Sequence, residues 1–312
     1  LTMIGDIFTK AVLVGILSSG IRLATPYLYA AIGETFSQRS GVLNLGVEGQ
    51  MLLGAFAAFF VTYTTESMWL GLLAAAIVGL LMGLAMAFVT INLQAEQGIS
   101  GIGFYLFGLG LSDLLFQKLL GTVETVSGFR PIYIPGLSDI PILGEIFFKQ
   151  SVLVYGAYLL VFIAWFVLNK TTLGLKIKAV GESPQAADSL GVSVSKVRYF
   201  TVMLGGTLSG IAGASLSISL LNVFQQNMTS GLGFIAVALV YFGGWRPVAV
   251  MGGALLFSMV NSLQLWVQVL NIPIPSDFAV MMPYVLTIIV LVITVQRVRP
   301  PSALSKPFER GH

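Results

Sequence analysis

Residues 67–95 of the chain read SMWLGLLAAAIVGLLMGLAMAFVTINLQA, a stretch without a charged side chain. About 20 apolar residues in a helix cross the hydrocarbon core of a bilayer, so this stretch predicts a membrane-spanning helix. Residues 199–296 continue the pattern, because only Arg246 and Asp277 carry a charge there. The two stretches predict an all-α, polytopic helical membrane protein.

The composition of the 312-residue chain supports this fold class. Hydrophobic residues make up 56% and charged residues 9%, whereas soluble domains contain about 25% charged residues. The mean hydropathy is +0.91. A soluble fold of this length needs a charged, hydrated surface that the sequence does not provide. We therefore treat residues 1–312 as a single transmembrane domain.

Several kinds of chemistry are excluded by the residues that are missing. The chain has no cysteine, and its one histidine is His312. Disulfides, thiolate chemistry, a His/Cys metal site and a histidine-dependent catalytic triad are therefore excluded. No GxxxxGK[ST] phosphate loop occurs, so the chain is not expected to hydrolyse ATP by itself.

Apolar runs predict about nine membrane spans, and eight or ten also fit. The predicted spans are 11–32, 45–63, 69–91, 98–116, 152–168, 199–220, 231–244, 247–270 and 279–296. The 231–244 run is short and begins with glycines. We expect it to be a half-helix or a re-entrant segment.

Lysine and arginine residues determine the predicted orientation, because cytoplasmic loops are enriched in them. They gather in the 169–198 loop and in the 297–312 tail. We expect both segments to face the cytoplasm, with four spans between them. Counting backward then places the proline-containing 117–151 segment and the N-terminus outside.

A short similarity links two glycine-containing segments. Residues 99–104 read ISGIGF and residues 229–234 read TSGLGF. In the predicted topology the first opens a span that runs outward and the second opens one that runs inward. Such segments at matching places in two halves point to an inverted repeat around a transport site. A chance match in a glycine-rich chain is the alternative.

The first polar cluster, residues 33–49, reads GETFSQRSGVLNLGVEG. Its glycines predict an interrupted helix, and its charges are costly beside apolar spans unless they are paired. One hypothesis is an irregular stretch inside the helix bundle that helps to form a pathway. The other is a cytoplasmic turn in which Glu34 pairs with Arg39. If a helix covers this stretch, Asn44 and Glu48 share a face.

The second cluster is the basic loop at 172–198. Ser183 is a suitable N-cap, Pro184 suits the first helical position and Gly191 ends the run, so a short helix is predicted at 184–190. Ala186, Ala187 and Leu190 would form a small apolar face on it. This face either inserts into a groove of another protein or belongs to an amphipathic connector on the membrane.

Uncharged amide side chains gather in two places in the second half of the chain. They are Asn222, Gln225, Gln226 and Asn227, and further on Asn261, Gln264 and Gln268. The later three form one stripe along the 247–270 helix. Such a stripe either hydrogen-bonds a neighbouring helix or lines a polar path. Asp113, in the fourth predicted span, is interpreted as interfacial.

Three of these stretches together resemble a known family. Gly33–Gly49 resembles the N-terminal signature of permease subunits in the sugar, nucleoside and branched-chain amino acid group of ATP-binding cassette importers. Gly174–Gly191 resembles the cytoplasmic coupling segment of that group. Gly231–Leu239, followed by Pro247, resembles its late motif. The nearest likeness is to permeases of nucleoside and simple-sugar importers.

The resemblance implies a subunit without catalytic activity or cofactor of its own in the plasma (inner) membrane of a prokaryote. Implied partners are a second permease, identical or related, a cytoplasmic ATPase that binds ATP and Mg²⁺, and an extracytoplasmic substrate-binding protein. The resemblance favours ATPase docking over a connector for the short helix. The predicted docking residues are Gly181, Glu182, Pro184, Ala186, Ala187, Leu190 and Gly191.

A neutral solute needs hydrogen bonds and stacking along its path rather than covalent chemistry. The predicted path residues are Asn44, Glu48, Phe104, Asn222, Asn261 and Gln264. The bulky run at 104–107 departs from the family pattern, and it either narrows the path or stacks against a base or sugar ring. A nucleoside is the expected solute, with a pentose or a branched-chain amino acid as alternatives. A stand-alone secondary transporter would need intramembrane acids, for which only Glu48 and Asp113 qualify.

Overall fold

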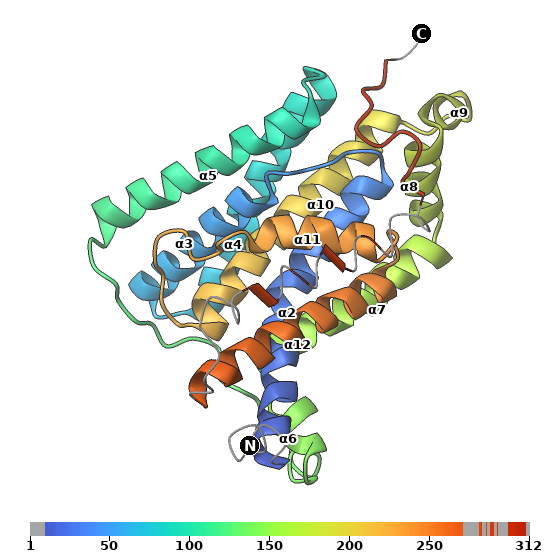
Figure 1. Cartoon of the computed structure of the whole chain (residues 1–312). Helices are drawn as coiled ribbons and strands as arrows, with labels where there is room; N and C mark the ends of the chain where they lie inside the picture. The colour runs from blue at the N-terminus through green and yellow to red at the C-terminus, as the bar shows by residue number, and fades with distance from the viewer. Residues whose placement is uncertain are drawn as a thin grey trace.

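The computed structural model describes residues 10–270 and 299–309, together with residues 281, 282, 285, 288, 289 and 292. Helices dominate this part of the chain (Figure 1). In chain order they are α2 (Lys10–Arg39), α3 (Val47–Thr65), α4 (Met68–Ala87), η1 (Phe88–Asn92), α5 (Gln97–Leu119), α6 (Leu143–Phe147), α7 (Val152–Lys170), α8 (Thr172–Glu182), α9 (Pro184–Ser189), α10 (Val194–Ser215), η2 (Leu216–Leu220), α11 (Leu232–Phe242) and α12 (Pro247–Val269). The π-helices η1 and η2 continue α4 and α10.

The predicted all-α, polytopic architecture is confirmed. In the described part of the chain, six helical stretches are long and apolar enough to cross a membrane: Lys10–Arg39, Met68–Asn92, Gln97–Leu119, Val152–Lys170, Val194–Leu220 and Pro247–Val269. α3 has 19 residues but begins with more polar side chains. α11 has 11 residues, so it is about 17 Å long and cannot cross a core of about 30 Å. The predicted half-helix is therefore present, whereas the predicted 279–296 span lies mainly outside the described residues.

α10 lies in the middle of the bundle and contacts α2, α3 and α4 (Figure 1). Glycines allow this packing. A Cβ atom added at Gly206 would collide with the backbone of Gly79 and Gly83 on α4, and one at Gly213 would collide with Met51 on α3. Small residues let membrane helices approach until their backbones touch, which increases van der Waals contact where lipid supplies no hydrophobic driving force.

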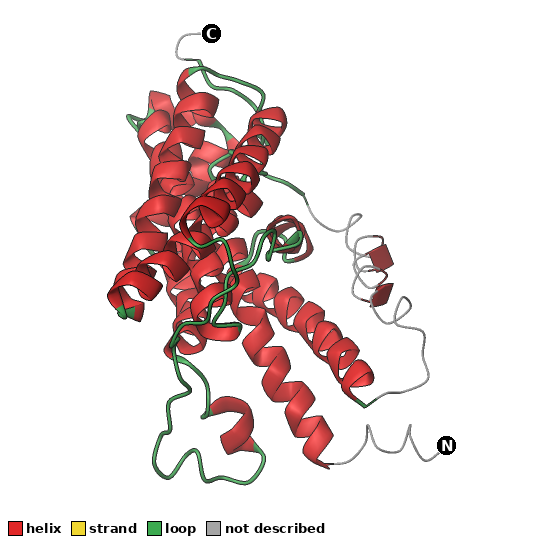
Figure 2. Ribbon diagram, turned by 90° about the vertical axis from the view of Figure 1, so that its left-hand side faces the viewer, coloured by secondary structure: helices red, strands yellow, loops and turns green. Residues whose placement is uncertain are grey.

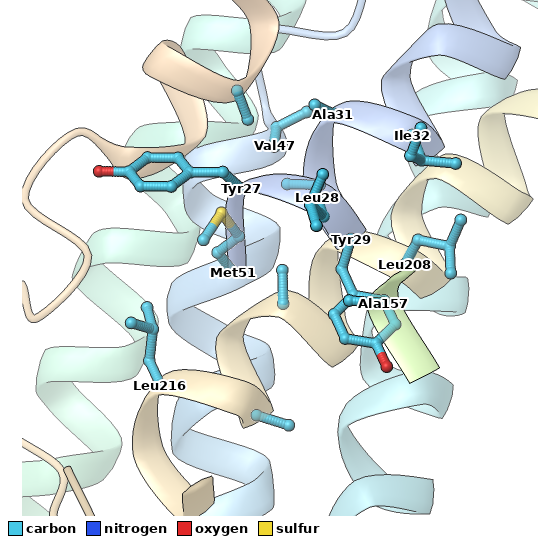
Figure 3. Packing of buried hydrophobic residues seen from close by; sticks show 14 of the residues in the cluster. Tyr27, Leu28, Tyr29, Ala31, Ile32, Val47, Met51, Ala157, Leu208 and Leu216 are labelled. Atoms are coloured by element: carbon cyan, nitrogen blue, oxygen red, sulfur yellow. The ribbon is translucent and has the colours of Figure 1, made fainter. Parts of the chain in front are cut away.

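An apolar interior surrounds the second half of α2 (Figure 3). Tyr27, Leu28 and Ile32 of α2 are buried, as is Leu208 of α10. Tyr27 also packs edge-on against Phe257 of α12, with the ring centroids 5.3 Å apart. α2 is thus covered by neighbours on several sides. This close packing fixes the position of residues 34–39, which form the polar end of α2.

The two ends of the bundle carry different segments. α8, α9 and residues 299–309 lie together at one end, and the 117–151 segment with α6 lies at the other (Figures 1 and 2). Phe129 N donates to Ile218 O at 2.8 Å and Val126 N donates to Asn222 O at 3.0 Å, so this segment runs along the end of η2. Because α8, α9 and residues 299–309 share one end, the described parts of the two basic segments, 169–198 and 297–312, are neighbours. The membrane side that each end faces stays a prediction.

In the first polar cluster, residues 33–49, the predicted helix interruption is confirmed at residues 40–46, and the shared face of Asn44 and Glu48 is wrong. α2 continues without interruption to Arg39, so only residues 40–46 are non-helical. Gly33 does not break the helix because it packs directly on Gly205 of α10, where a larger side chain would be crowded. Asn44 precedes the N-cap of α3, so Asn44 and Glu48 do not share a helix face.

The two similar glycine segments have different backbones. Residues 99–104 lie inside α5. In contrast, Ser230 and Gly231 have φ angles of 44° and 91° and form the turn before α11. The similarity of residue types therefore does not extend to local structure at these positions.

Candidate functional site

Glu48 joins the start of α3 to the start of α11. Its side chain is 1% exposed, and it accepts hydrogen bonds from Thr229 Oγ1 at 2.5 Å, Gly231 N at 2.7 Å and Gly233 N at 2.6 Å. The first N–H groups of a helix lack intrahelical partners and carry partial positive charge. The carboxylate satisfies two amides at the α11 end, and these donors stabilise a charge that would otherwise be costly inside the bundle.

Glycine at position 233 makes this contact possible. A Cβ atom at Gly233 would lie 2.6 Å from both the Cα and the backbone N of Glu48, which is closer than nonbonded atoms approach. Gly231 adopts a φ angle of 91°, a conformation that glycine adopts readily. The glycines of this segment therefore allow the turn and the close approach that place Glu48 at the end of α11.

A second buried polar group, here called the amide cluster, consists of Glu34, Gln38, Asn44 and Gln50. Gln38 Nε2 and Asn44 N donate to Glu34 Oε1 at 3.0 and 2.9 Å. Asn44 Nδ2 donates to Gln50 Oε1 at 3.1 Å. All four residues are 0% exposed. The amide cluster therefore links α2, the 40–46 turn and α3 inside the protein.

Trp245 connects the amide cluster to the turn after α11. Its indole Nε1 donates to Gln38 Oε1 at 2.7 Å, and Trp245 is 2% exposed. Arg39 Nε donates to the backbone carbonyl of Trp245 at 3.0 Å. The alternative in which Glu34 pairs with Arg39 is therefore wrong: Glu34 bonds within the amide cluster, and Arg39 bonds to the Trp245 turn.

Two atoms of the amide cluster keep unused hydrogen-bonding capacity. Glu34 Oε2 and Gln50 Nε2 are buried and have no hydrogen-bond partner within the described part of the chain. Buried polar atoms without partners cost free energy, and in native proteins each one calls for an explanation such as a functional role or a water molecule. This cluster can therefore offer an acceptor and a donor to a water molecule or a polar solute.

Three predicted path residues lie close together. Asn44 and Glu48 flank Gly46, whose backbone N–H donates to Asn44 Oδ1 at 2.9 Å. A Cβ atom at Gly46 would lie 2.9 Å from Cβ of Phe104 on α5. The start of α3 thus combines an amide, a carboxylate and an aromatic ring.

Asn222 lies elsewhere, in a polar cavity of about 380 Å³ at the 117–151 end of the bundle. Arg22, Arg130, Gln150 and Ser219 also line this cavity. Asn222 Oδ1 and Gln150 Oε1 are buried and have no hydrogen-bond partner among the described residues. The cavity therefore presents guanidinium donors and amide acceptors at the end of the bundle opposite α8 and α9.

The amide stripe on α12 is separate from both groups. Asn261 and Gln264 are partly exposed and Gln268 is exposed. The contact of α12 with α2 uses Ser262 instead, which is 0% exposed and donates to Ile16 O at 2.8 Å. The stripe makes no hydrogen bond to α2 within the described part of the chain, and its role in a path stays a prediction.

The predicted short helix is present as α9, with Pro184 first and Ser183 as the N-cap, although the Ser183 side chain makes no capping hydrogen bond. Gly191 follows with a φ angle of 81°. The structure divides the predicted docking residues into two sets. Gly181, Pro184 and Ala187 are buried, whereas Glu182, Ala186, Leu190 and Gly191 are exposed.

The burial of Ala187 has a definite cause. Its side chain packs with Val180 of α8 and Val194 of α10 beneath α9. Ala187 therefore supports the short helix from inside, and a partner protein would meet the exposed residues Ala186 and Leu190 instead.

Sequence reasoning missed four polar or aromatic residues. Gln38 and Gln50 lie in or next to the first polar cluster but carry no charge, so the cost of burying a charge does not single them out. Trp245 lies between the predicted 231–244 and 247–270 spans, and Arg198 ends the 169–198 loop, where the sequence shows it only as one of several basic residues. The available signal for Arg198 was its place beside a predicted span, where an arginine needs partners.

The chain is similar to proteins named as ABC transporter permeases. Residues 16–291 match the family described as branched-chain amino acid transport system / permease component. The guanosine ABC transporter permease protein NupQ of Bacillus subtilis is 39% identical, over 92% of this chain and 94% of its own length. The nucleoside ABC transporter permease protein NupC of Lactococcus lactis is 38% identical, over 90% and 92%. The putative glucose ABC transporter permease protein TsgC13 of Haloferax volcanii is 41% identical, over 84% and 80%.

No solved structure matches the chain. The family match covers most of the chain, and the relatives are similar over most of their lengths. The chain therefore belongs to this family of ABC transporter permease components.

Proposed function

We propose that this chain is the permease subunit of an ATP-driven importer and that it conducts a nucleoside across the plasma membrane of a prokaryote. The observation that carries this proposal is the similarity, over about nine tenths of the chain, to two permeases named for guanosine and nucleoside transport. The relative named for glucose, at 41% identity, makes a simple sugar the second candidate.

The polar groups described above suit a neutral solute. Asn44, Glu48 and Phe104 gather at the start of α3, where Tyr105 also packs edge-on against Phe234 of α11 at 5.2 Å. Nucleobases stack on aromatic side chains, and amide and carboxylate oxygens accept hydrogen bonds from sugar hydroxyl groups. We assign the inner part of the path to this region.

The outer part of the proposed path is the cavity that Asn222 lines. Its arginine and amide groups can hydrogen-bond a solute before it enters the bundle. Asn261 and Gln264 of α12 would line the path from the side, where the described chain leaves them partly exposed. This assignment places the entrance at the 117–151 end, facing the outside.

The proposed partners follow from the same assignment. An ATPase that holds ATP and Mg²⁺ would dock at α8 and α9, at the cytoplasmic end, and a substrate-binding protein would deliver the solute at the opposite end. Bacillus subtilis has a second protein named as a guanosine ABC transporter permease, NupP, and it is 26% identical to this chain. A heterodimer of two related permeases is therefore the proposed membrane unit.

The test is to purify the permease with its ATPase and binding protein and to measure ATP hydrolysis with nucleosides, free bases, pentoses, glucose and branched-chain amino acids. We expect nucleosides to stimulate hydrolysis selectively. Stimulation by glucose or a pentose alone would favour the second candidate. Uptake that persists when the catalytic glutamate of the ATPase is replaced would support a secondary transporter and contradict the proposal.

A further inference from the structure

Residues 301–308, here called the strap, lie at the end of the bundle that holds α8 and α9 (Figure 1). Ala303 N donates to Gly181 O at 2.9 Å, and Ser305 N donates to Gly41 O at 3.1 Å. Ala303 is 4% exposed. The strap therefore joins the end of α8 to the turn that follows α2.

Arg198, near the start of α10, provides a third attachment. It is 2% exposed, and its Nε and Nη1 atoms donate to Ser40 O at 3.2 Å and to Lys306 O at 3.1 Å. Arginine suits this position because its rigid fork carries several donors and reaches two carbonyl groups on separate segments. The guanidinium group thus connects α10, the turn after α2 and the strap.

Apolar contacts extend the strap beneath α9. Phe308 packs on the cluster formed by Val180, Ala187 and Val194, which come from α8, α9 and α10. α9 has 6 residues, far fewer than the roughly 12 that an isolated helix needs for marginal stability in water. α9 therefore keeps its position through these neighbours, and the strap is one of them.

From these contacts we infer that the strap and Arg198 position the α8–α9 docking surface for the transport cycle. They hold this surface against α2 and α10, so that movement of a docked ATPase reaches the membrane helices. The inference rests on the proposed function, because it requires an ATPase at α8 and α9. A loosened surface still offers its exposed side chains to the ATPase but transmits less movement.

The first experiment measures solute moved per ATP hydrolysed in the complete complex, reconstituted in proteoliposomes. Arg198→Gln replaces the guanidinium group with a shorter side chain that carries fewer donors. Phe308→Ala removes the aromatic ring beneath α9. We expect both variants to retain the bound ATPase while the ratio falls about fivefold or more, the range of a modest coupling free energy. Lys306→Ala is the matched control with an unchanged ratio, because only the backbone carbonyl of Lys306 accepts from Arg198. An unchanged ratio in both test variants overturns the inference and leaves the proposed function standing.

A second experiment tests the strap without the ATPase. Ser302 Oγ donates to a Glu182 carboxylate oxygen at 3.1 Å, and the chain has no cysteine. The double variant Ser302→Cys, Glu182→Cys in the full-length permease should therefore react with a short bismaleimide to give an internal cross-link, and adding Arg198→Gln should lower the yield. A folded protein that gives no cross-link overturns the inference. Failure of every solute to stimulate the wild-type ATPase would instead overturn the proposed function.

Discussion

At the scale of single residues, one carboxylate determines how two helix ends meet. Glu48→Gln keeps the size of the side chain, but its amide offers one acceptor oxygen to the three donors in residues 229–233. We expect the free energy of unfolding to fall by about 2 kcal/mol, the typical cost of a buried donor left without a partner. Denaturation of the purified permease in detergent, followed by tryptophan fluorescence, measures this difference.

Glu66→Gln, at the C-cap of α3, is the matched control. Glu66 is exposed at the other end of α3, so the free energy of unfolding should change by less than about 0.5 kcal/mol. Equal losses in the two variants would contradict a specific role of Glu48 at the start of α11.

Two glycines at equivalent places in the similar segments have opposite surroundings. Gly233→Ala would place a Cβ atom 2.6 Å from the backbone of Glu48, whereas a Cβ atom at Gly103 meets nothing within 4 Å. We expect Gly233→Ala to destabilise the protein by about 1–3 kcal/mol through overpacking. Gly103→Ala should be neutral or stabilising by up to about 1 kcal/mol, because alanine favours a helix. Thermal unfolding of both purified variants tests this, and similar losses would contradict the described contact.

At the scale of elements, the packing of α10 on α4 depends on backbone contact. Gly206→Ile would insert a branched side chain where even a Cβ atom meets the backbone of Gly79 and Gly83. We expect this change to lower the midpoint of thermal unfolding or to prevent folding, because two helices must separate. Gly252→Ile, at an exposed position of α12 where a Cβ atom meets nothing within 4 Å, should retain the wild-type midpoint. A normal yield and midpoint for Gly206→Ile would show that the two helices do not pack this closely.

Sequence reasoning succeeded for the elements because their signals are local. Charge-free runs of helical length have few alternatives to membrane helices, and Pro184 with Gly191 predicts α9. The site was harder to predict because its contacts connect distant segments. Glu48 and Thr229 are 181 positions apart, and nothing near either residue identifies the other. Burial of Ala187 likewise depends on α8 and α10, so the sequence of α9 showed an apolar face but not which of its residues point inward.

At the scale of the whole molecule, the proposed solute entrance and the proposed ATPase docking surface lie at opposite ends of one bundle (Figure 1). The two ends can therefore be tested independently.

At the α8–α9 end, two neighbouring residues differ in exposure. Leu190 is 86% exposed, whereas Ala187 is 3% exposed. A charge at Leu190 therefore disturbs only the surface, and a charge at Ala187 disturbs the core beneath α9.

Leu190→Asp is the variant that separates docking from folding. We expect it to change the free energy of unfolding by less than about 0.5 kcal/mol, because the side chain is in solvent. It should also abolish co-purification of the ATPase, because a carboxylate in an apolar groove loses its hydration without gaining a partner. Ala187→Asp should lose both stability and the ATPase, since the charge would be buried against Val180 and Val194. Co-purification of the ATPase with a stable Leu190→Asp permease would place the docking surface somewhere other than α9.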